Sequence, residues 1–256
     1  MSEANIVAPT GPTVVLVHGA FADSSSWNGV VAGLQAAGVP VTTVPNPLRG
    51  ITADAAYVAS ALAQIPGPVL AVGHSYGGAV ITNAALRAGN VVGLVYVAAF
   101  APDQGEKLFD IEAGSTDSVL NSALVQRTYP TGDGDATQVE VGIDPEKFHD
   151  AFAADLPLEQ TAVMAATQRP ASLLGFVEPT GTPAWRSLPS WAVVATGDKA
   201  AGSDVVRSMA QRAGATITEV EGSHVIMISN PQVVIDVIRQ ALATPASAAS
   251  PSGAMS

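Results

Sequence analysis

Strand-like and helix-like patterns alternate along this chain. The strand patterns are short, and most are apolar and rich in β-branched residues, as in parallel strands buried on both faces; they cover residues 13–17, 39–44, 69–72, 91–98, 191–195 and 216–220. Helical patterns lie between them, at residues 27–37, 53–64, 79–88, 204–213 and 231–242. This alternation predicts an α/β fold with a mostly parallel central sheet flanked by helices.

The pattern changes between residues 101 and 188. No strong strand pattern is found there, and helical segments are interrupted at Gly132-Asp133-Gly134 and at several prolines. We therefore expect an inserted helical region at 101–188, with a core made of residues 1–100 and 189–243. The remaining residues, 244–256, are rich in Ala, Ser and Pro and are expected to be a disordered tail.

The sequence Gly73-His74-Ser75-Tyr76-Gly77-Gly78 directly follows a buried strand and precedes a helix. A serine at the tip of so tight a turn needs neighbours without Cβ atoms, so that strand and helix can approach each other. The start of the helix supplies unpaired backbone N–H groups and partial positive charge, which suit a developing oxyanion. The pattern predicts that Ser75 is a nucleophile.

A serine nucleophile needs a base, and the chain has four histidines. His224 follows the strand pattern at 216–220 and precedes the last helix, so it lies at the sheet edge where Ser75 is expected. We expect His18 to hold its own loop by hydrogen bonding and His74 to point away from the site. His149 belongs to the inserted region. His224 is the predicted base.

The base needs a carboxylate partner, for which there are two candidates. Asp198 follows the strand pattern at 191–195, and the order Ser, Asp, His is the one found in α/β-hydrolases. Asp103 also follows a strand pattern, and a carboxylate there could reach the histidine. Asp198 is preferred, and Asp103 is the alternative.

Two backbone N–H groups must converge on the oxyanion. One is expected from Tyr76, the residue after the nucleophile, and the other from the loop that follows the first strand. In that loop Ala20 is the first choice and Phe21 the second. The side chains expected to contact substrate are those of Phe21, Phe100, Phe152 and Val225.

Together these residues resemble the α/β-hydrolase fold family, specifically its small, cofactor-free, serine esterase-like members. The resemblance covers residues 12–242 and rests on five segments in family order: Val15 to Ala20, Gly73 to Gly78, Ala98 to Pro102, Thr196 to Asp198 and Gly222 to His224. It implies that residues 101–188 form a cap, that Ser75, Asp198 and His224 form a catalytic triad, and that the protein cleaves carboxylic esters through an acyl-enzyme.

Two departures from relatives of the same fold argue against dehalogenase, epoxide hydrolase and hydroxynitrile lyase activities. Ser75 stands where haloalkane dehalogenases and epoxide hydrolases carry an aspartate, and Val225 and Gly19 stand where plant hydroxynitrile lyases carry a lysine and a threonine. Lactonase, carbon–carbon bond hydrolase, perhydrolase and lyase activities remain alternatives, as does a receptor-like protein that binds a ligand without turnover.

Composition limits the partners. The formal net charge is −11 and no basic run is present, which argues against nucleic acid and against acidic membranes. The chain of 256 residues contains no cysteine, so disulfides and thiolate chemistry are excluded. We expect a cytoplasmic monomer or homodimer that acts on a small ester-like molecule and needs no metal or cofactor. No signal peptide pattern is recognised at the N-terminus.

Overall fold

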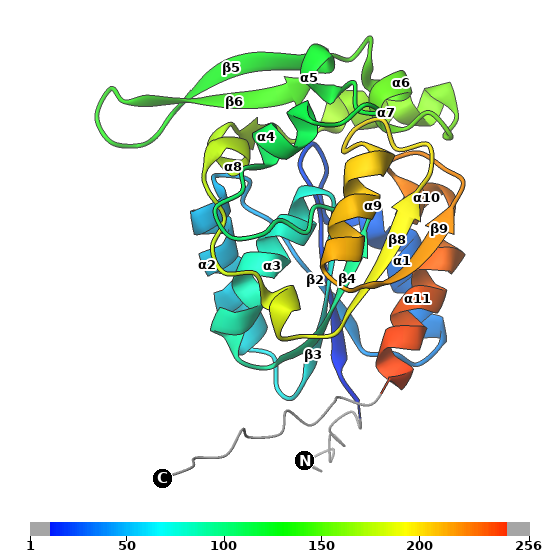
Figure 1. Cartoon of the computed structure of the whole chain (residues 1–256). Helices are drawn as coiled ribbons and strands as arrows, with labels where there is room; N and C mark the ends of the chain where they lie inside the picture. The colour runs from blue at the N-terminus through cyan, green and yellow to red at the C-terminus, as the bar shows by residue number, and fades with distance from the viewer. Residues whose placement is uncertain (1–10, 245–256) are drawn as a thin grey trace, which may run out of the picture.

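The central sheet has six parallel strands in the order β2-β1-β3-β4-β8-β9 (Figure 1). The computed structural model describes residues 11–244. The strands are β1 (Thr13–Val17), β2 (Val41–Val44), β3 (Val69–His74), β4 (Val91–Val97), β8 (Ser190–Ala195) and β9 (Thr216–Val220). The predicted α/β-hydrolase fold with a parallel central sheet is confirmed, and each predicted strand is found within about two residues of its expected ends.

Helices cover both faces of this sheet. In Figure 1, α2 (Ile51–Ala63) and α3 (Tyr76–Ala88) lie on one side, while α1 (Asn28–Ala36) and α11 (Pro231–Ala243) lie on the other. Helix α9 (Ser203–Arg212) packs on β8 and β9. Two short helical segments, η1 (Ser24–Trp27) and α10 (Ile226–Ser229), follow β1 and β9.

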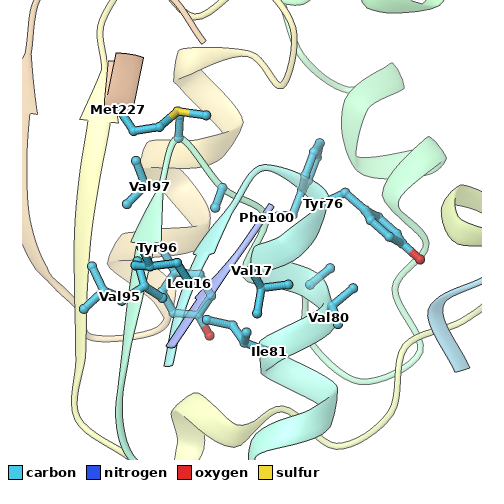
Figure 2. Packing of buried hydrophobic residues seen from close by; sticks show 14 of the residues in the cluster. Leu16, Val17, Tyr76, Val80, Ile81, Val95, Tyr96, Val97, Phe100 and Met227 are labelled. Atoms are coloured by element: carbon cyan, nitrogen blue, oxygen red, sulfur yellow. The ribbon is translucent and has the colours of Figure 1, made fainter. Parts of the chain in front are cut away.

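The core forms where β-branched strand residues meet the alanine-rich helices. Leu16 and Val17 of β1 are fully buried, as are Val80 and Ile81 of α3, and Figure 2 shows these side chains close together. Small buried residues, such as Ala79 and Ala84 of α3, let the helices approach the sheet. A rigid sheet fixes the positions of the loops at its carboxyl edge.

Residues 101–188 form a segment inserted between β4 and β8, which we call the insertion. Figure 1 shows it across the carboxyl end of the sheet. Its elements are α4 (Leu108–Ala113), α5 (Leu120–Ala123), β5 (Leu124–Pro130), β6 (Thr137–Ile143), α6 (Phe148–Phe152), α7 (Leu158–Thr167), β7 (Ala171–Ser172), α8 (Leu174–Val177) and η2 (Ala184–Arg186).

The insertion contains the predicted helices, but the expectation that it lacks strands is wrong. Strands β5, β6 and β7 form an antiparallel sheet, of which β5 and β6 are a hairpin. Gly132 and Gly134, interpreted from sequence as helix breakers, have φ values of 88° and 55° in the hairpin turn. The alternation of Val139, Val141 and Ile143 with Gln138, Glu140 and Gly142 is the signal that was overlooked.

The predicted tail, residues 244–256, lies outside the described residues except for Thr244. Among residues 11–244, no helix combines the length and apolar character needed to cross a bilayer.

Helix α3 approaches the end of β1 and the loop after β4 so closely that a Cβ atom has no room at Gly77 or Gly78 of its first turn. A Cβ atom at Gly77 would lie 2.5 Å from the carbonyl oxygen of Val17 and 2.8 Å from that of His18. At Gly78 it would lie 2.6 Å from the carbonyl oxygen of Phe100. All three obstacles are backbone atoms, which cannot rotate away.

We therefore expect Gly77→Ala to lower the free energy of unfolding by about 3 kcal/mol, because α3 must move away from β1. Urea unfolding followed by circular dichroism measures this. Gly11→Ala is the matched control: a Cβ there meets nothing within 4 Å, so its effect should stay within about 0.5 kcal/mol. Equal effects of the two substitutions would contradict the proposed close approach.

Candidate active site

Ser75 occupies a strained turn between β3 and α3. Its φ and ψ are 52° and −124°, a conformation that residues with a side chain seldom adopt. The surrounding backbone holds it there: its carbonyl oxygen accepts from Gly78 N at 2.9 Å and from Phe100 N at 3.2 Å. Its N–H donates to the carbonyl of Val97 at 3.3 Å. The turn places Ser75 at the carboxyl edge of the sheet.

His224 and Asp198, predicted as base and acid, form a buried pair. His224 Nδ1 lies 2.8 Å from Asp198 Oδ2, and each residue is only 1% exposed. The other carboxylate oxygen, Oδ1, accepts from the backbone N–H groups of Ala200 at 2.9 Å and Ala201 at 3.0 Å. Both oxygens are therefore bound, and with the Nδ1 proton directed to Asp198, the Nε2 atom of His224 is free to accept a proton.

The sequence predicted that His74 points away from the site. In the structure, its side chain packs against the predicted base, His224. The two imidazole centroids are 4.7 Å apart, and His74 Nε2 donates to the carbonyl oxygen of His224 at 2.9 Å. The sequence expectation was wrong because the loop that carries His224 returns over the end of β3. His74, the residue before Ser75, is thus in direct contact with His224.

His74 is neutral in the folded protein. Its complete burial, followed by the neighbouring His224, lowers its pKa well below the ordinary value of 6.5. A neutral His74 adds no positive charge beside His224.

The loop after β1 lies directly against Ser75. A Cβ atom at Gly19 would be 2.7 Å from the Cβ of Ser75, so this loop can pass only because residue 19 is glycine. Ala20 and Phe21 follow and are buried, and Phe21 has a φ of 61°. Tyr76 is the first residue of α3, where backbone N–H groups have no helical acceptor. The predicted oxyanion donors therefore come from the two segments that flank Ser75.

His18 holds this loop, as expected. Its Nδ1 lies 2.9 Å from the carbonyl oxygen of Gly19, and its Nε2 accepts from Asn46 N at 2.9 Å. Burial, the largest effect, lowers the pKa of His18, so it too is neutral.

Asp103, the alternative acid, is engaged elsewhere. Its Oδ1 accepts from Gln104 N at 2.7 Å and pairs with Arg186 of the insertion. The Gln104 N–H and the Arg186 guanidinium hold the pKa of Asp103 below its ordinary value. The structure brings Asp198, and not Asp103, to His224.

Aromatic side chains surround His224 and the loop after β1. Phe152 lies 4.9 Å from the His224 ring, and Phe21 lies 6.2 Å from Phe152 and 6.3 Å from Phe176. Phe176 in turn lies 5.7 Å from Tyr76. Phe176 was not among the predicted site residues.

The remaining predicted substrate contacts, Phe100 and Val225, are also buried, and Figure 2 shows Phe100 above the start of α3, near Tyr76. Ser75 itself is 7% exposed. The candidate nucleophile is therefore almost enclosed, with several apolar side chains among its surroundings.

A crevice of about 310 Å³ opens beside Phe21. It lies between the loop after β1 and helix α7 of the insertion, and its lining includes Asp23, Asn28, Gln160 and Met164. Phe21 is shared by this crevice and by the aromatic cluster around His224.

A sequence profile of the Alpha/beta hydrolase family matches residues 14–237. No curated protein matches the chain. Among solved structures, polyneuridine aldehyde esterase is similar with a TM-score of 0.75 and 21% identity, over 90% of this chain and 99% of that one.

Two further structures show the same likeness. A methylesterase, MES16 from Arabidopsis, has a TM-score of 0.73 at 20% identity, over 90% of this chain and 98% of that one. A pyrethroid hydrolase, PytH, has a TM-score of 0.70 at 21% identity, over 92% and 99%. At these identities the likeness concerns the fold.

The two neutral, buried histidines predict a loss of stability in mild acid. The pKa values of His18 and His74 are lowered in the folded state, so below pH 6.5 the unfolded chain binds more protons and is favoured. Between pH 6.5 and 5.5 we expect the free energy of unfolding to fall by up to about 1 kcal/mol for each histidine.

Urea unfolding at several pH values between 6.5 and 5.5 measures how the free energy of unfolding changes with pH. His74→Gln keeps an N–H donor but does not titrate, so the free energy of unfolding should change less with pH in this variant than in the wild type. An unchanged slope would show that His74 is not the source.

Proposed function

Because the chain belongs to the Alpha/beta hydrolase family, we propose that it is a serine hydrolase that cleaves carboxylic esters through an acyl-enzyme. The observation that carries this proposal is the buried hydrogen bond of 2.8 Å between His224 and Asp198, beside a serine held in a strained strand-to-helix turn. The similar structures include an esterase, a methylesterase and a pyrethroid hydrolase, and their names support the choice of ester cleavage.

In the proposed first step, Nε2 of His224 takes the proton from Ser75 Oγ, and Oγ attacks the carbonyl carbon of the ester. Asp198 stabilises the imidazolium that forms, and the N–H groups of Ala20 and Tyr76 receive the oxyanion. His224 then gives its proton to the leaving alcohol oxygen, and the carbon–oxygen bond breaks. The acyl group remains on Ser75.

In the second step, His224 takes a proton from a water molecule, whose oxygen attacks the acyl carbon. The proton returns to Ser75 Oγ as the acid leaves. No metal or cofactor takes part in this scheme.

The surroundings of Ser75 favour small or medium hydrophobic substrates. Phe21, Phe152 and Phe176 form an aromatic cluster at the predicted base and oxyanion loop. Apolar walls suit an acyl or alcohol group of similar character, and the low exposure of Ser75 favours compact groups.

We expect a fluorophosphonate probe to label Ser75, and p-nitrophenyl esters of short acyl chains to be hydrolysed. Ser75→Ala should abolish labelling and lower ester hydrolysis by roughly 10⁴-fold or more, because the nucleophile is lost. Mass spectrometry locates the label. Ser60→Ala, on the exposed side of α2, is the matched control and should change neither.

A folded wild-type protein that is neither labelled nor active on this panel would contradict the proposal. Tight binding of an ester or lactone without turnover, retained in Ser75→Ala, would favour a receptor-like role instead.

The assignment of the acid is tested by comparing two substitutions. Asp198→Asn should lower kcat by roughly 10³-fold or more, since the His224 tautomer is no longer fixed and its cation is unsupported. Asp103→Asn should leave kcat within a few fold of the wild type, because Asp103 is bound to Arg186. Similar losses in both variants would contradict the assignment of Asp198.

A further inference from the structure

The carboxylate of Asp155, in the insertion, binds Ser223, the residue that precedes His224. Asp155, in the loop between α6 and α7, accepts two hydrogen bonds from Ser223: from the backbone N–H at 2.8 Å and from the hydroxyl at 2.5 Å. Each carboxylate oxygen takes one of them. Because both donors belong to a single residue, this contact fixes the position and orientation of Ser223.

The contact extends to the other side of the base. The hydroxyl of Ser223, which donates to Asp155, also accepts from Val225 N at 3.4 Å. Asp155 and Ser223 thus connect to both chain neighbours of His224. The approach is close: a Cβ atom at Gly222 would lie 3.0 Å from Asp155 Oδ2.

The same segment of the insertion also touches the imidazole itself. Phe152, three residues before Asp155, packs on the His224 ring at 4.9 Å and is buried. One short stretch of the insertion therefore contacts both the ring of His224 and the backbone that carries it.

Asp155 is charged at neutral pH. Partial burial acts to raise its pKa, but the hydrogen bonds from Ser223 outweigh this effect and hold the pKa below its ordinary value. Asp155 lies at the exposed surface of the insertion whereas Ser223 is buried, so its contribution to His224 is one of geometry and not of a strong local field.

We propose that Asp155 is a positioning residue for His224, acting through Ser223. This inference rests on the proposed function, in which Nε2 of His224 must meet Ser75 Oγ. Asp198 and His74 hold His224 from the core, and Asp155 is the anchor from the insertion. Without Asp155, the residue before His224, Ser223, loses one backbone and one side-chain hydrogen bond, and the base is less often in its reactive position.

The experiment compares Asp155→Ala, Asp155→Asn and Ser223→Ala, with Asp150→Ala as control. Asp150 lies on α6, close in sequence, and its side chain is 89% exposed. With p-nitrophenyl acetate, Asp155→Ala should lower kcat by about tenfold and change KM by less than about threefold. Asp155→Asn can still accept from the N–H of Ser223 and donate to its hydroxyl, so it should stay within about threefold of the wild type.

Ser223→Ala should lower kcat by a few fold, and the double variant Asp155→Ala with Ser223→Ala should lose no more than Asp155→Ala alone, since both act through one contact. Ser223→Ala also keeps the test valid if Asp155→Ala does not fold. A lower melting temperature of Asp155→Ala without a change in kcat would overturn the proposal. A kcat of Asp155→Asn as low as that of Asp155→Ala would also overturn it.

A second measurement does not depend on turnover. The low-field proton signal of the His224 Nδ1–H, assigned by its loss in His224→Gln, should shift or broaden in Asp155→Ala and stay unchanged in Asp150→Ala. An unchanged signal in Asp155→Ala would overturn the proposal. If the wild-type protein lacks Ser75-dependent ester hydrolysis, the proposed function is wrong, and the proton signal still decides whether Asp155 positions His224.

Discussion

The positive φ of Ser75 is sustained by the absence of Cβ atoms on three neighbours. Gly73 faces the backbone of Gly77, Gly77 faces that of Val17 and His18, and Gly19 lies against Ser75 itself, each at a distance that a Cβ could not occupy. Strained residues cost of order 1–3 kcal/mol and persist only where the surroundings determine them completely. Here the buried sheet does so: the N–H of Ser75 donates to Val97 of β4, and its carbonyl oxygen accepts from Phe100 in the loop that follows. The predicted oxyanion donors then follow from the same close packing, since they belong to the segments pressed against the serine.

Buried polar groups are satisfied around this turn with few exceptions. Asp198 divides its oxygens between His224 and two backbone N–H groups, and His18 connects Gly19 to Asn46. His74 is an exception: its Nε2 binds the carbonyl of His224, while its Nδ1 has no partner among residues 11–244. An unsatisfied buried nitrogen costs about 1–3 kcal/mol. This unfavourable energy arises at His74, which contacts the predicted base His224. Such local losses of stability are expected at functional sites.

Sequence alone predicts the core well, because its rules are local. Strand β9 was predicted at its observed bounds, since its pattern ends in a glycine-containing turn, and Ser75, His224 and Asp198 are recognisable because each follows a strand at one edge of the sheet. The hairpin of β5 and β6 was missed because half-exposed strands give weak patterns and turn glycines resemble helix breakers. Asp155 could not be found at all. A surface aspartate between two helices carries no sign in the sequence that its partner lies 68 residues away, beside His224.

The insertion is hydrogen-bonded to the loops that carry the predicted acid and base, and to the loop after β2 that adjoins His18. Arg169 donates to the carbonyl of Asn46 at 3.2 Å, beside His18; Val119 N donates to the carbonyl of Lys199 at 2.8 Å, next to Asp198; and Asp155 holds Ser223. A rigid opening of the whole insertion would break these bonds together, at a net cost of about 1 kcal/mol each, and would release the loops of the predicted acid and base at the same time. The core without the insertion would therefore hold the serine turn, which the glycines and the sheet determine, but would hold the loops of His224 and Asp198 less firmly. The strained serine is a property of the core, whereas the position of its predicted base is determined jointly by core and insertion.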